Sequence, residues 1–351
     1  PLYYSDLPYK IRLVGVCNRT RQKAETARET LDFAFATDDE DEIINHPDIE
    51  VINICTPNLY HKDAVIKALQ KRKHIYCDKP LAVNYQEAEE IVAHLDQAGV
   101  ITQMAMNYRF FPATIRAKEL IDEGRLGKVI SFQVSYLHSG SVDPGKPLGW
   151  KQEKRFGGGV LLDLGSHVLD LIYYFLGEIS AVFAETQILY GKRPDQEGKM
   201  VEVTAEDAVY MILKLKNGAT GMAAASKIAT GTEDELRFEL YGTKGALRFN
   251  LMQPNWLEYF DHTQPETPFG GFRGFTKIEC GQKYEKPGGV FPSPKVAIGW
   301  TRAHVHSLYN FLQCVYAGIP AAPSLYEGAY IQYIMEKVAE AAQKQKWITL
   351  S

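Results

Sequence analysis

The sequence predicts an N-terminal α/β domain on a doubly wound parallel sheet and a C-terminal α+β domain on a largely antiparallel open sheet. The chain's 351 residues suffice for two domains of ordinary size. Its first third alternates short apolar runs with helical stretches, as right-handed βαβ crossovers require. Beyond it, successive strand-like runs follow one another with short turns, which is typical of antiparallel pairing. We therefore divide the chain into residues 1–106 and 107–351, with the C-terminal helices available to pack back on the first domain.

The composition argues for a protein that binds small molecules. Hydrophobic residues make up 45% and charged residues 23%, and the formal net charge is -4, so no basic surface favours nucleic acid. No apolar run reaches the ~20 residues of a membrane helix, and the first residues show no export signal. The five cysteines never occur in CxxC spacing, so we expect reduced core thiols in a cytoplasmic protein.

The first domain shows five apolar runs and four helical stretches. The expected strands are Ile11 to Cys17, Phe33 to Ala36, Val51 to Cys55, His74 to Cys77 and Val100 to Met106. The expected helices are Arg21 to Leu31, Glu40 to Asn45, Leu59 to Lys71 and Tyr85 to Ala98. The last helix has a capping box, Asn84 with Glu87, and ends at Gly99.

The second domain combines helices with a run of strands. Helices are expected at Phe111 to Glu123, Val160 to Leu176, Trp300 to Tyr316 and Tyr326 to Gln343, the last opened by a capping box of Ser324 and Glu327. Strands are expected at Val129 to Leu137, Ala181 to Leu189, Ala208 to Leu215, Ala219 to Ser226 and Glu235 to Leu240. Gln264 to Pro294, rich in Gly and Pro, reads as an extended surface excursion.

Polar residues follow the strands of the first domain. In a doubly wound sheet the ligand lies outside the carboxyl ends of the strands, so these residues are informative. They are Asn18, Arg19 and Thr20; Thr56, Pro57 and Asn58 with His61; Asp78, Lys79 and Pro80; and Asn107, Tyr108 and Arg109. Thr20, Asn58 and Asn84 serve equally well as helix caps. Lys79 is either a solvated loop lysine or an ammonium group facing the ligand, and the second interpretation is favoured.

The segment GGGVLLDLGSHVLD, Gly157 to Asp170, carries the second cluster. We attribute its glycines to a close approach of loop and helix, because no βαβ strand precedes them as a phosphate cradle requires. Asp163 and His167 are four residues apart and share one face of an α-helix, with Asp170 near that face. They form either a satisfied buried polar pair or an acid/base site. A zinc site is disfavoured because no third ligand at suitable spacing accompanies the pair.

Taken together, TPN with His61, DKP, NYRF and GGGVLLDLGSH resemble the Gfo/Idh/MocA family of glucose-fructose oxidoreductase and inositol dehydrogenase. The resemblance covers nearly the whole chain, although the family's usual Glu-Lys-Pro appears here as Asp78-Lys79-Pro80. It implies a Rossmann domain and hydride transfer between a nicotinamide cofactor and a secondary alcohol of a sugar or cyclitol. It also implies that Lys79 and His167 flank the reacting hydroxyl, with Asp163 beside them.

The chemistry of alcohol oxidation agrees with this resemblance. The hydroxyl proton must leave as hydride is transferred from the same carbon, which needs a group that titrates near neutrality. We therefore expect His167 to be the general base or acid, Lys79 to polarise the oxygen, and Asp163 to hold both. The substrate is expected to border four further residues, Tyr108, Arg109, Trp150 and Lys151, of which Trp150 is equally well a packing residue.

The resemblance also assigns cofactor-binding residues. Thr56, Pro57, Asn58 and His61 line the nicotinamide-ribose side, and Asp78 and Lys79 lie at the cofactor. Asn18 stands where an acidic residue would bind the ribose 2′-hydroxyl, and Arg19 follows it. Because a guanidinium group beside an uncharged side chain accommodates a 2′-phosphate, we expect NAD or NADP, with NADP favoured.

Several expectations concern the whole protein. In the family that the sequence resembles, a strand and a GxGxxG turn precede this opening segment, and no GxGxxG occurs here. The resemblance therefore implies that Pro1 to Leu7 is the tail of the first helix, and we expect about 20 or more residues of strand and turn before it. An uncovered sheet face predicts a homodimer or homotetramer. The rival functions are a glycosidase with a tightly held nicotinamide cofactor and a non-catalytic sugar or cofactor sensor. Retention of Lys79, Asp163 and His167 argues against the sensor.

Overall fold

A computed structural model describes residues 8–285, 288–290 and 296–350. The chain forms two compact units. Unit 1 comprises Pro1–Ala105 and Ser307–Ala329, and unit 2 comprises Met106–His306 and Tyr330–Ser351. The expected helix tail at Pro1 to Leu7 and parts of the expected excursion lie outside the described residues.

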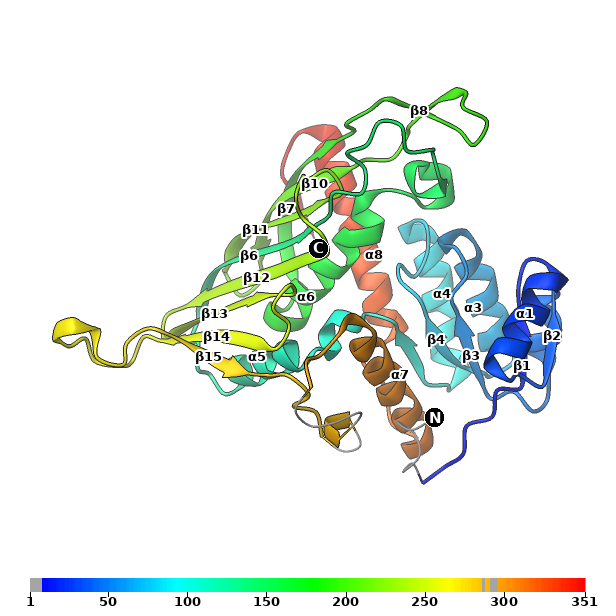
Figure 1. Ribbon diagram of the computed structural model, residues 1–351, viewed down its shortest axis with the longest axis horizontal. Coiled ribbons are helices and arrows are strands. Elements are labelled where there is room, and N and C mark those ends of the chain that lie inside the picture. Colours follow the sequence, from blue (N-terminus) through cyan, green and yellow to red (C-terminus); the bar gives the residue numbers. More distant parts are fainter. Residues whose placement is uncertain (1–7, 286–287, 291–295, 351) are drawn as a thin grey trace. The chain divides into compact units, whose positions relative to one another are not determined.

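Unit 1 contains two parallel sheets flanked by helices (Figure 1). Its strands are β1 (Gly15–Cys17), β2 (Phe35–Thr37), β3 (Val51–Ile54), β4 (His74–Cys77) and β5 (Thr102–Met104). Its helices are α1 (Arg21–Leu31), α2 (Glu40–Asn45), α3 (His61–Gln70) and α4 (Tyr85–Ala98). One sheet has the order β1-β2 and the other β3-β4-β5, and every pairing is parallel. The predicted alternation of strand and helix is therefore confirmed.

Strand β1 is shorter and more exposed than the sequence predicted. Ile11 and Leu13 lie outside it and are 43% and 45% exposed. Within the described residues β1 pairs only with β2, and β3 only with β4, so one edge of each strand lacks a paired neighbour there. The prediction that all cysteines are core thiols is wrong for Cys17 and Cys55, which are exposed at the ends of β1 and β3. All five cysteines are free thiols.

Side chains cap the N-termini of three helices at the positions that the sequence predicted. Thr20 accepts a hydrogen bond from the Lys23 amide, and Asn84 accepts one from the Glu87 amide. Glu327 accepts from the Ser324 amide at 2.7 Å, which closes the second capping box. Each cap satisfies backbone N–H groups that a helix leaves unpaired at its start. Asn58 itself begins a 3₁₀ turn, Asn58–Tyr60, whose N-cap residue is Pro57.

Unit 2 is built on a nine-stranded mixed sheet in the order β15-β14-β13-β12-β6-β11-β10-β7-β16. The strands are β6 (Val129–Leu137), β7 (Ile179–Gln187), β10 (Ala208–Leu215), β11 (Thr220–Ser226), β12 (Glu235–Gly242), β13 (Gly245–Asn250), β14 (Trp256–Asp261), β15 (Phe275–Glu279) and β16 (Ile348–Thr349). Only β6 and β11 pair in parallel, so the sheet is largely antiparallel as predicted. A separate hairpin joins β8 (Lys192–Pro194) to β9 (Met200–Glu202).

The sequence missed several of these strands. Strands β13 and β14 extend the sheet beyond β12, and β15 lies inside the segment expected to be an extended surface excursion. Their pairing partners explain the miss. Each of these strands is defined by register with its neighbour, as Leu247 is opposite Leu240, and such pairing cannot be seen in a single strand's composition.

Helices cover one face of the nine-stranded sheet, and the other face is open (Figure 1). The helices of unit 2 include α5 (Pro112–Asp122) and α6 (Ser166–Leu176). Helix α7 (Trp300–Ala317) begins in unit 2, and helix α8 (Leu325–Lys344) ends in it. Strand β6 alternates accordingly, with Phe132 and Val134 buried beneath the helices and Gln133 exposed on the other side. This alternation separates a packed face from an open face.

One helical stretch, Lys154–Leu176, has the length and mean hydropathy, 1.3, of a membrane-spanning helix. The sequence analysis did not anticipate it. Its most apolar window is 78% buried within the protein, as the core helix of a water-soluble domain also is. Such burial makes it weak evidence for a membrane.

The helix expected at Val160 to Leu176 begins with a turn of different geometry. Leu161–Gly165 forms a π-helical turn, and regular α-helix starts only at Ser166. Asp163 lies within this π turn and His167 lies in the first turn of α6, so the pair spans a change of helical geometry. Such π turns occur frequently at functional sites.

Candidate active site

The loops that follow β3 and β4 are tied together by His61. Its Nδ1 lies 2.8 Å from the Pro80 carbonyl oxygen, and its Nε2 lies 2.7 Å from the Thr56 carbonyl oxygen. The ring is fully buried, and Asn58 beside it is only 6% exposed. His61 therefore holds the two loops together, and its expected place on the nicotinamide-ribose side remains a prediction.

Lys79 stands at the carboxyl end of β4 in a partly buried position. Its amide donates a hydrogen bond to the Asp78 carboxylate at 2.8 Å, which shapes the turn, and the Lys79-Pro80 peptide is cis. Partial burial disfavours the interpretation of Lys79 as a freely solvated loop lysine. An ammonium group held in such a place is suited to a polar or anionic ligand.

The remaining strand-end residues of unit 1 are accessible. Asn18, Arg19, Thr56 and Pro57 are exposed, and Asn18 accepts a hydrogen bond from the Arg19 amide at 2.8 Å. Exposed hydroxyl, amide and guanidinium groups beyond the ends of parallel strands fit the ribose and nicotinamide parts of a dinucleotide. These residues would hold that cofactor from unit 1.

A second polar cluster lies along one edge of the sheet in unit 2. His138 follows the end of β6 and Lys227 the end of β11, and these two strands run parallel. Asp234 immediately precedes β12, which is antiparallel to β6. The three residues therefore share one edge of the sheet. None of the three was among the site residues expected from the sequence.

Asp163 forms ion pairs with two lysines at this edge. Its carboxylate lies 2.9 Å from Lys151 Nζ and 2.8 Å from Lys227 Nζ. That Asp163 also holds Lys79 and His167 remains a prediction. Two cations beside one carboxylate favour its ionised form. Asp163 is thus suited to binding donors and anchoring Lys151.

His167 is 5% exposed and lies among aromatic rings. Its ring stands edge-on to Tyr108, with centroids 4.7 Å apart, and to Tyr136, 6.0 Å apart. Tyr108 and Tyr136 share a short hydroxyl contact. Burial raises the pKa of Tyr108 to about 12 and raises that of Tyr136 further, so both phenols stay neutral at ordinary pH. These packed rings fix the plane of the imidazole.

Arg109 was expected to border the substrate, and the structure shows its side chain engaged within the protein. Its guanidinium is 5% exposed and makes a buried ion pair with Asp170, whose Oδ1 lies 2.6 Å from Arg109 Nη2. Arg109 Nε also donates to Asp170 Oδ2 at 2.9 Å, and the guanidinium lies over the Tyr174 ring. The pair joins the turn before α5 to helix α6. NYRF therefore contributes one candidate site residue, Tyr108, and one structural residue.

Trp150 and Lys151 lie in a 3₁₀ turn that rests on the glycine triplet. A Cβ added to Gly158 would come within 2.7 Å of the Lys151 carbonyl group, so only glycine permits this approach. The expected close contact of loop and helix is confirmed. Trp150 is 38% exposed, and Lys151 Nζ lies 5.6 Å from its ring centre.

One sequence signal could have found Lys227 and His138. Both directly follow predicted strands, by the same rule that identified the polar residues of the first domain. Tyr136 and Asp234 carry no such local signal, because their roles depend on the pairing of β6 with β12. In the part of the chain that the structure describes, no group of three or more metal-ligating side chains occurs.

These features define a class of protein: a dinucleotide-binding domain joined to an α+β domain whose sheet edge carries acid/base groups. Residues 3–106 match the family described as oxidoreductase family, NAD-binding Rossmann fold, and residues 114–248 match the GFO/IDH/MocA C-terminal domain. The chain is 32% identical to the levoglucosan dehydrogenase of Pseudarthrobacter phenanthrenivorans, over 99% of this chain and 92% of that protein. The chain therefore belongs to the Gfo/Idh/MocA family.

Other relatives agree with this membership. The myo-inositol 2-dehydrogenase of Thermotoga maritima is 28% identical over 67% of this chain and 66% of that protein. A solved structure of levoglucosan dehydrogenase in complex with NADH superposes with a TM-score of 0.94 at 30% identity, covering 100% of this chain and 93% of that chain. The protein is accordingly an NAD(H)-dependent dehydrogenase of the family that acts on sugars and cyclitols.

Proposed function

We propose that the protein oxidises one ring hydroxyl of a pyranose-like sugar, with levoglucosan as the first candidate. The observation that carries this proposal is the 32% identity to levoglucosan dehydrogenase along almost the full length of both chains. A solved structure of that relative in complex with NADH and levoglucosan has a TM-score of 0.93 to this chain.

The proposed chemistry assigns one role to each of three residues. His167 accepts the hydroxyl proton, Lys79 polarises the same oxygen, and Asp163 with its two lysines binds a neighbouring hydroxyl. The nicotinamide cofactor supplies the hydride acceptor. The roles of Lys79 and His167 follow from the family motif, while Asp163's follows from the ion pairs it makes.

For the cofactor, we propose that NAD and NADP are both accepted. NADH in the solved relatives supports NAD. Asn18 and exposed Arg19 support tolerance of a 2′-phosphate, because no carboxylate stands at position 18 to repel it. Initial rates with each nucleotide at several concentrations measure the preference directly.

The activity is tested by incubating the protein with NAD or NADP and a panel of anhydrosugars, pyranoses and inositols. Reduced nicotinamide should appear by its absorbance in step with a ketosugar product, with levoglucosan among the best substrates. A free sugar released from a glycoside with no net change in nicotinamide would instead support the glycosidase. Absence of turnover with every sugar and both nucleotides would contradict the proposal.

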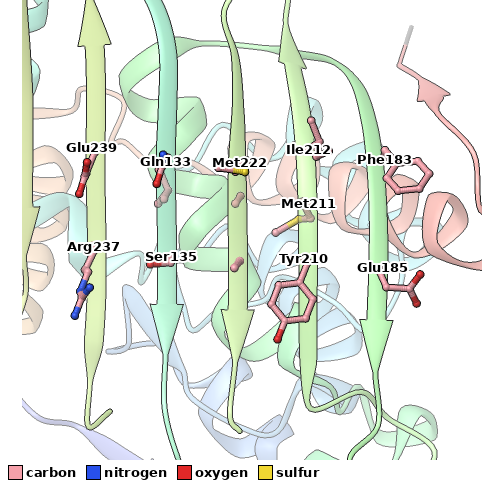
Figure 2. Close-up of a pocket in the computed structure, with 13 residues that line it drawn as sticks. Gln133, Ser135, Phe183, Glu185, Tyr210, Met211, Ile212, Met222, Arg237 and Glu239 are labelled. Carbon is pink, nitrogen blue, oxygen red and sulfur yellow. The ribbon is translucent and has the colours of Figure 1, made fainter. Parts of the chain in front are cut away.

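We also propose that the open sheet face of unit 2 binds a second copy of the chain. Two rows of outward side chains cross strands β12, β6, β11, β10 and β7 (Figure 2). One row runs Arg237, Ser135, Ala224, Tyr210, Glu185, and the other runs Glu239, Gln133, Met222, Ile212, Phe183. The face is apolar in the middle and carries a depression of about 440 Å³.

Charge makes this face complementary to itself. A two-fold axis parallel to β11 would place Arg237 of one copy opposite Glu185 of the other, with Met222 and Ala224 meeting at the axis. Isologous dimers need a surface that is complementary to itself in this way. Tyr210, Ile212 and Met222, which are 41–54% exposed, would then be covered.

A further inference from the structure

A chain of four hydrogen-bonding side chains runs from the neighbourhood of His167 toward solvent. It begins at Tyr108 and continues through Tyr136 and Asp234 to His138. The two phenols are 3% and 4% exposed, whereas the Asp234 and His138 side chains are 40% and 31% exposed. Trp300 adds a fifth group at the buried end, where its Nε1 lies 3.3 Å from the Tyr108 oxygen.

Elementary hydrogen-bond chemistry determines the direction of every bond in this chain. An ionised carboxylate only accepts, and an indole N–H only donates. Burial acts to raise the pKa of Asp234, but hydrogen bonds from His138 and Tyr136 outweigh it and lower the pKa below its usual value. Asp234 is thus an acceptor, and Oδ1 receives the Tyr136 O–H at 2.6 Å and the His138 Nε2–H at 2.9 Å.

The remaining bonds follow from a count of protons. A phenol hydroxyl has one proton, and Tyr136 uses it to donate a hydrogen bond to Asp234. In the contact with Tyr108, the Tyr136 oxygen can therefore only accept. Tyr108 therefore donates its single hydrogen bond to Tyr136, while its oxygen accepts a hydrogen bond from Trp300 Nε1. One acceptor position remains on the Tyr108 oxygen, and no proton remains to donate.

We propose that Tyr136 and Asp234 are positioning residues that hold the Tyr108 hydroxyl proton in the hydrogen bond to Tyr136. Tyr108 then contacts the sugar only as a hydrogen-bond acceptor, and it selects a substrate hydroxyl that donates. The inference rests on the proposed function for the presence of a sugar beside Tyr108. The direction of the chain rests on the protein alone.

Deoxyfluoro analogues of the best substrate test this selection, because fluorine is close in size to hydroxyl and cannot donate. In the wild type, fluorine at the hydroxyl that Tyr108 contacts should raise KM about three- to tenfold with little change in kcat, the worth of one hydrogen bond. Tyr108→Phe should abolish this discrimination at that position only. Tyr136→Phe keeps the aromatic ring but frees the Tyr108 proton to donate, so the ratio of the two KM values should fall toward one.

Two further variants make the result interpretable. Asp234→Asn, at a partly exposed position, should lower the ratio in the same direction, since an amide can turn its N–H toward Tyr136; it carries the test if Tyr136→Phe does not fold. Tyr330→Phe removes another phenol hydroxyl of unit 2, bonded to the Ile179 amide at 2.9 Å, and should leave the ratio unchanged. A ratio that Tyr136→Phe and Asp234→Asn both leave at the wild-type value overturns the proposal.

A measurement without turnover separates this inference from the proposed function. If no sugar is oxidised, the proposed function fails, but the chain is still visible by NMR of selectively labelled tyrosine. The hydroxyl protons of Tyr108 and Tyr136 should resonate at low field in slow exchange. Tyr136→Phe should remove one signal and shift the other to higher field. A spectrum in which the Tyr108 proton is unaffected by Tyr136→Phe would overturn the proposal.

Discussion

Lys79 is the residue whose chemistry is most strongly constrained by its position. It is partly buried directly after a parallel strand, where an ammonium group needs a polar partner. His61 holds the loop that carries it by a hydrogen bond to the Pro80 carbonyl. We therefore expect this side chain to act on the reacting oxygen and not to serve stability.

The first prediction concerns Lys79→Ala. Loss of a cation that stabilises developing negative charge should lower kcat about 10²- to 10³-fold, with little change in the thermal midpoint of unfolding. Steady-state kinetics with the substrate identified by the sugar screen measures this. Lys71→Ala, which removes an exposed lysine after α3, is the matched control and should keep wild-type kcat. Wild-type kcat in Lys79→Ala would refute the assignment.

At the scale of elements, the ion pair of Arg109 and Asp170 joins the 3₁₀ turn Asn107–Phe110 to helix α6. Both side chains are almost completely buried, and the carboxylate receives several bonds from one guanidinium. A buried charge that loses its partner stays desolvated without compensation. This contact therefore fixes Tyr108 next to His167.

The second prediction follows from that burial. Asp170→Asn should lower the free energy of unfolding by about 3–5 kcal/mol, because the Arg109 charge is left uncompensated. Arg109→Met combined with Asp170→Leu should be less destabilised than Asp170→Asn, since both charges are gone. Urea unfolding followed by circular dichroism compares the three proteins. Equal stability of Asp170→Asn and wild type would show that the pair is not energetically important.

The third prediction concerns His306 in helix α7. Burial, together with the nearby Arg302 charge, lowers the pKa of His306 to about 4, and its ring lies 4.2 Å from that of Tyr284. The unfolded chain binds the proton at its ordinary pKa near 6.5, so folding favours the neutral ring. The free energy of unfolding therefore keeps its full value above about pH 6.5. It falls by up to about 3 kcal/mol as the pH drops toward 4, because the unfolded chain is protonated first.

Urea midpoints at pH 7 and pH 4.5 measure this loss. His306→Phe keeps an aromatic ring and removes the titrating group, so it should lose less stability than wild type between the two pH values. Carboxylates titrate equally in both proteins, which makes the difference between them specific to His306. A wild type and variant that lose equal stability would contradict the prediction.

At the scale of the whole molecule, the proposed dimer face is the feature with the largest consequence. Ala224 lies in the middle of one row of the open face, between Ser135 and Tyr210. A long charged side chain placed there would be buried without a partner in the isologous interface. The same side chain would point into water in the single chain.

The fourth prediction is therefore that Ala224→Arg converts dimers or tetramers into monomers without unfolding them. Sedimentation equilibrium should give the mass of a single chain for the variant and a multiple of it for wild type. Lys192→Ala removes an exposed lysine from the separate hairpin of β8 and β9; it is the control and should keep the wild-type mass. A monomeric wild type, or an Ala224→Arg protein of unchanged mass, would contradict the proposed interface.

Local sequence patterns predicted much of this protein's architecture and its family. Apolar runs alternating with helices predicted the parallel sheets, and the capping residues Thr20 and Asn84 predicted where helices begin. Motifs around Lys79 and His167 indicated the family, because each motif is a short contiguous stretch. These signals succeed since the physics behind them acts within one strand, one turn or one helix.

Tertiary structure decided which side chains meet. Asp163 pairs with Lys227 because β11 brings that lysine to it from 64 positions along the chain. Asp234 reaches Tyr136 only because β12 pairs with β6. Arg109 forms its ion pair with Asp170 because α6 packs against the turn that carries Arg109. The sequence by itself determined the helices and strands and the residues with suitable chemistry. Strand register and packing between distant segments determined which side chains each of those residues contacts, because such contacts join residues that no local pattern relates.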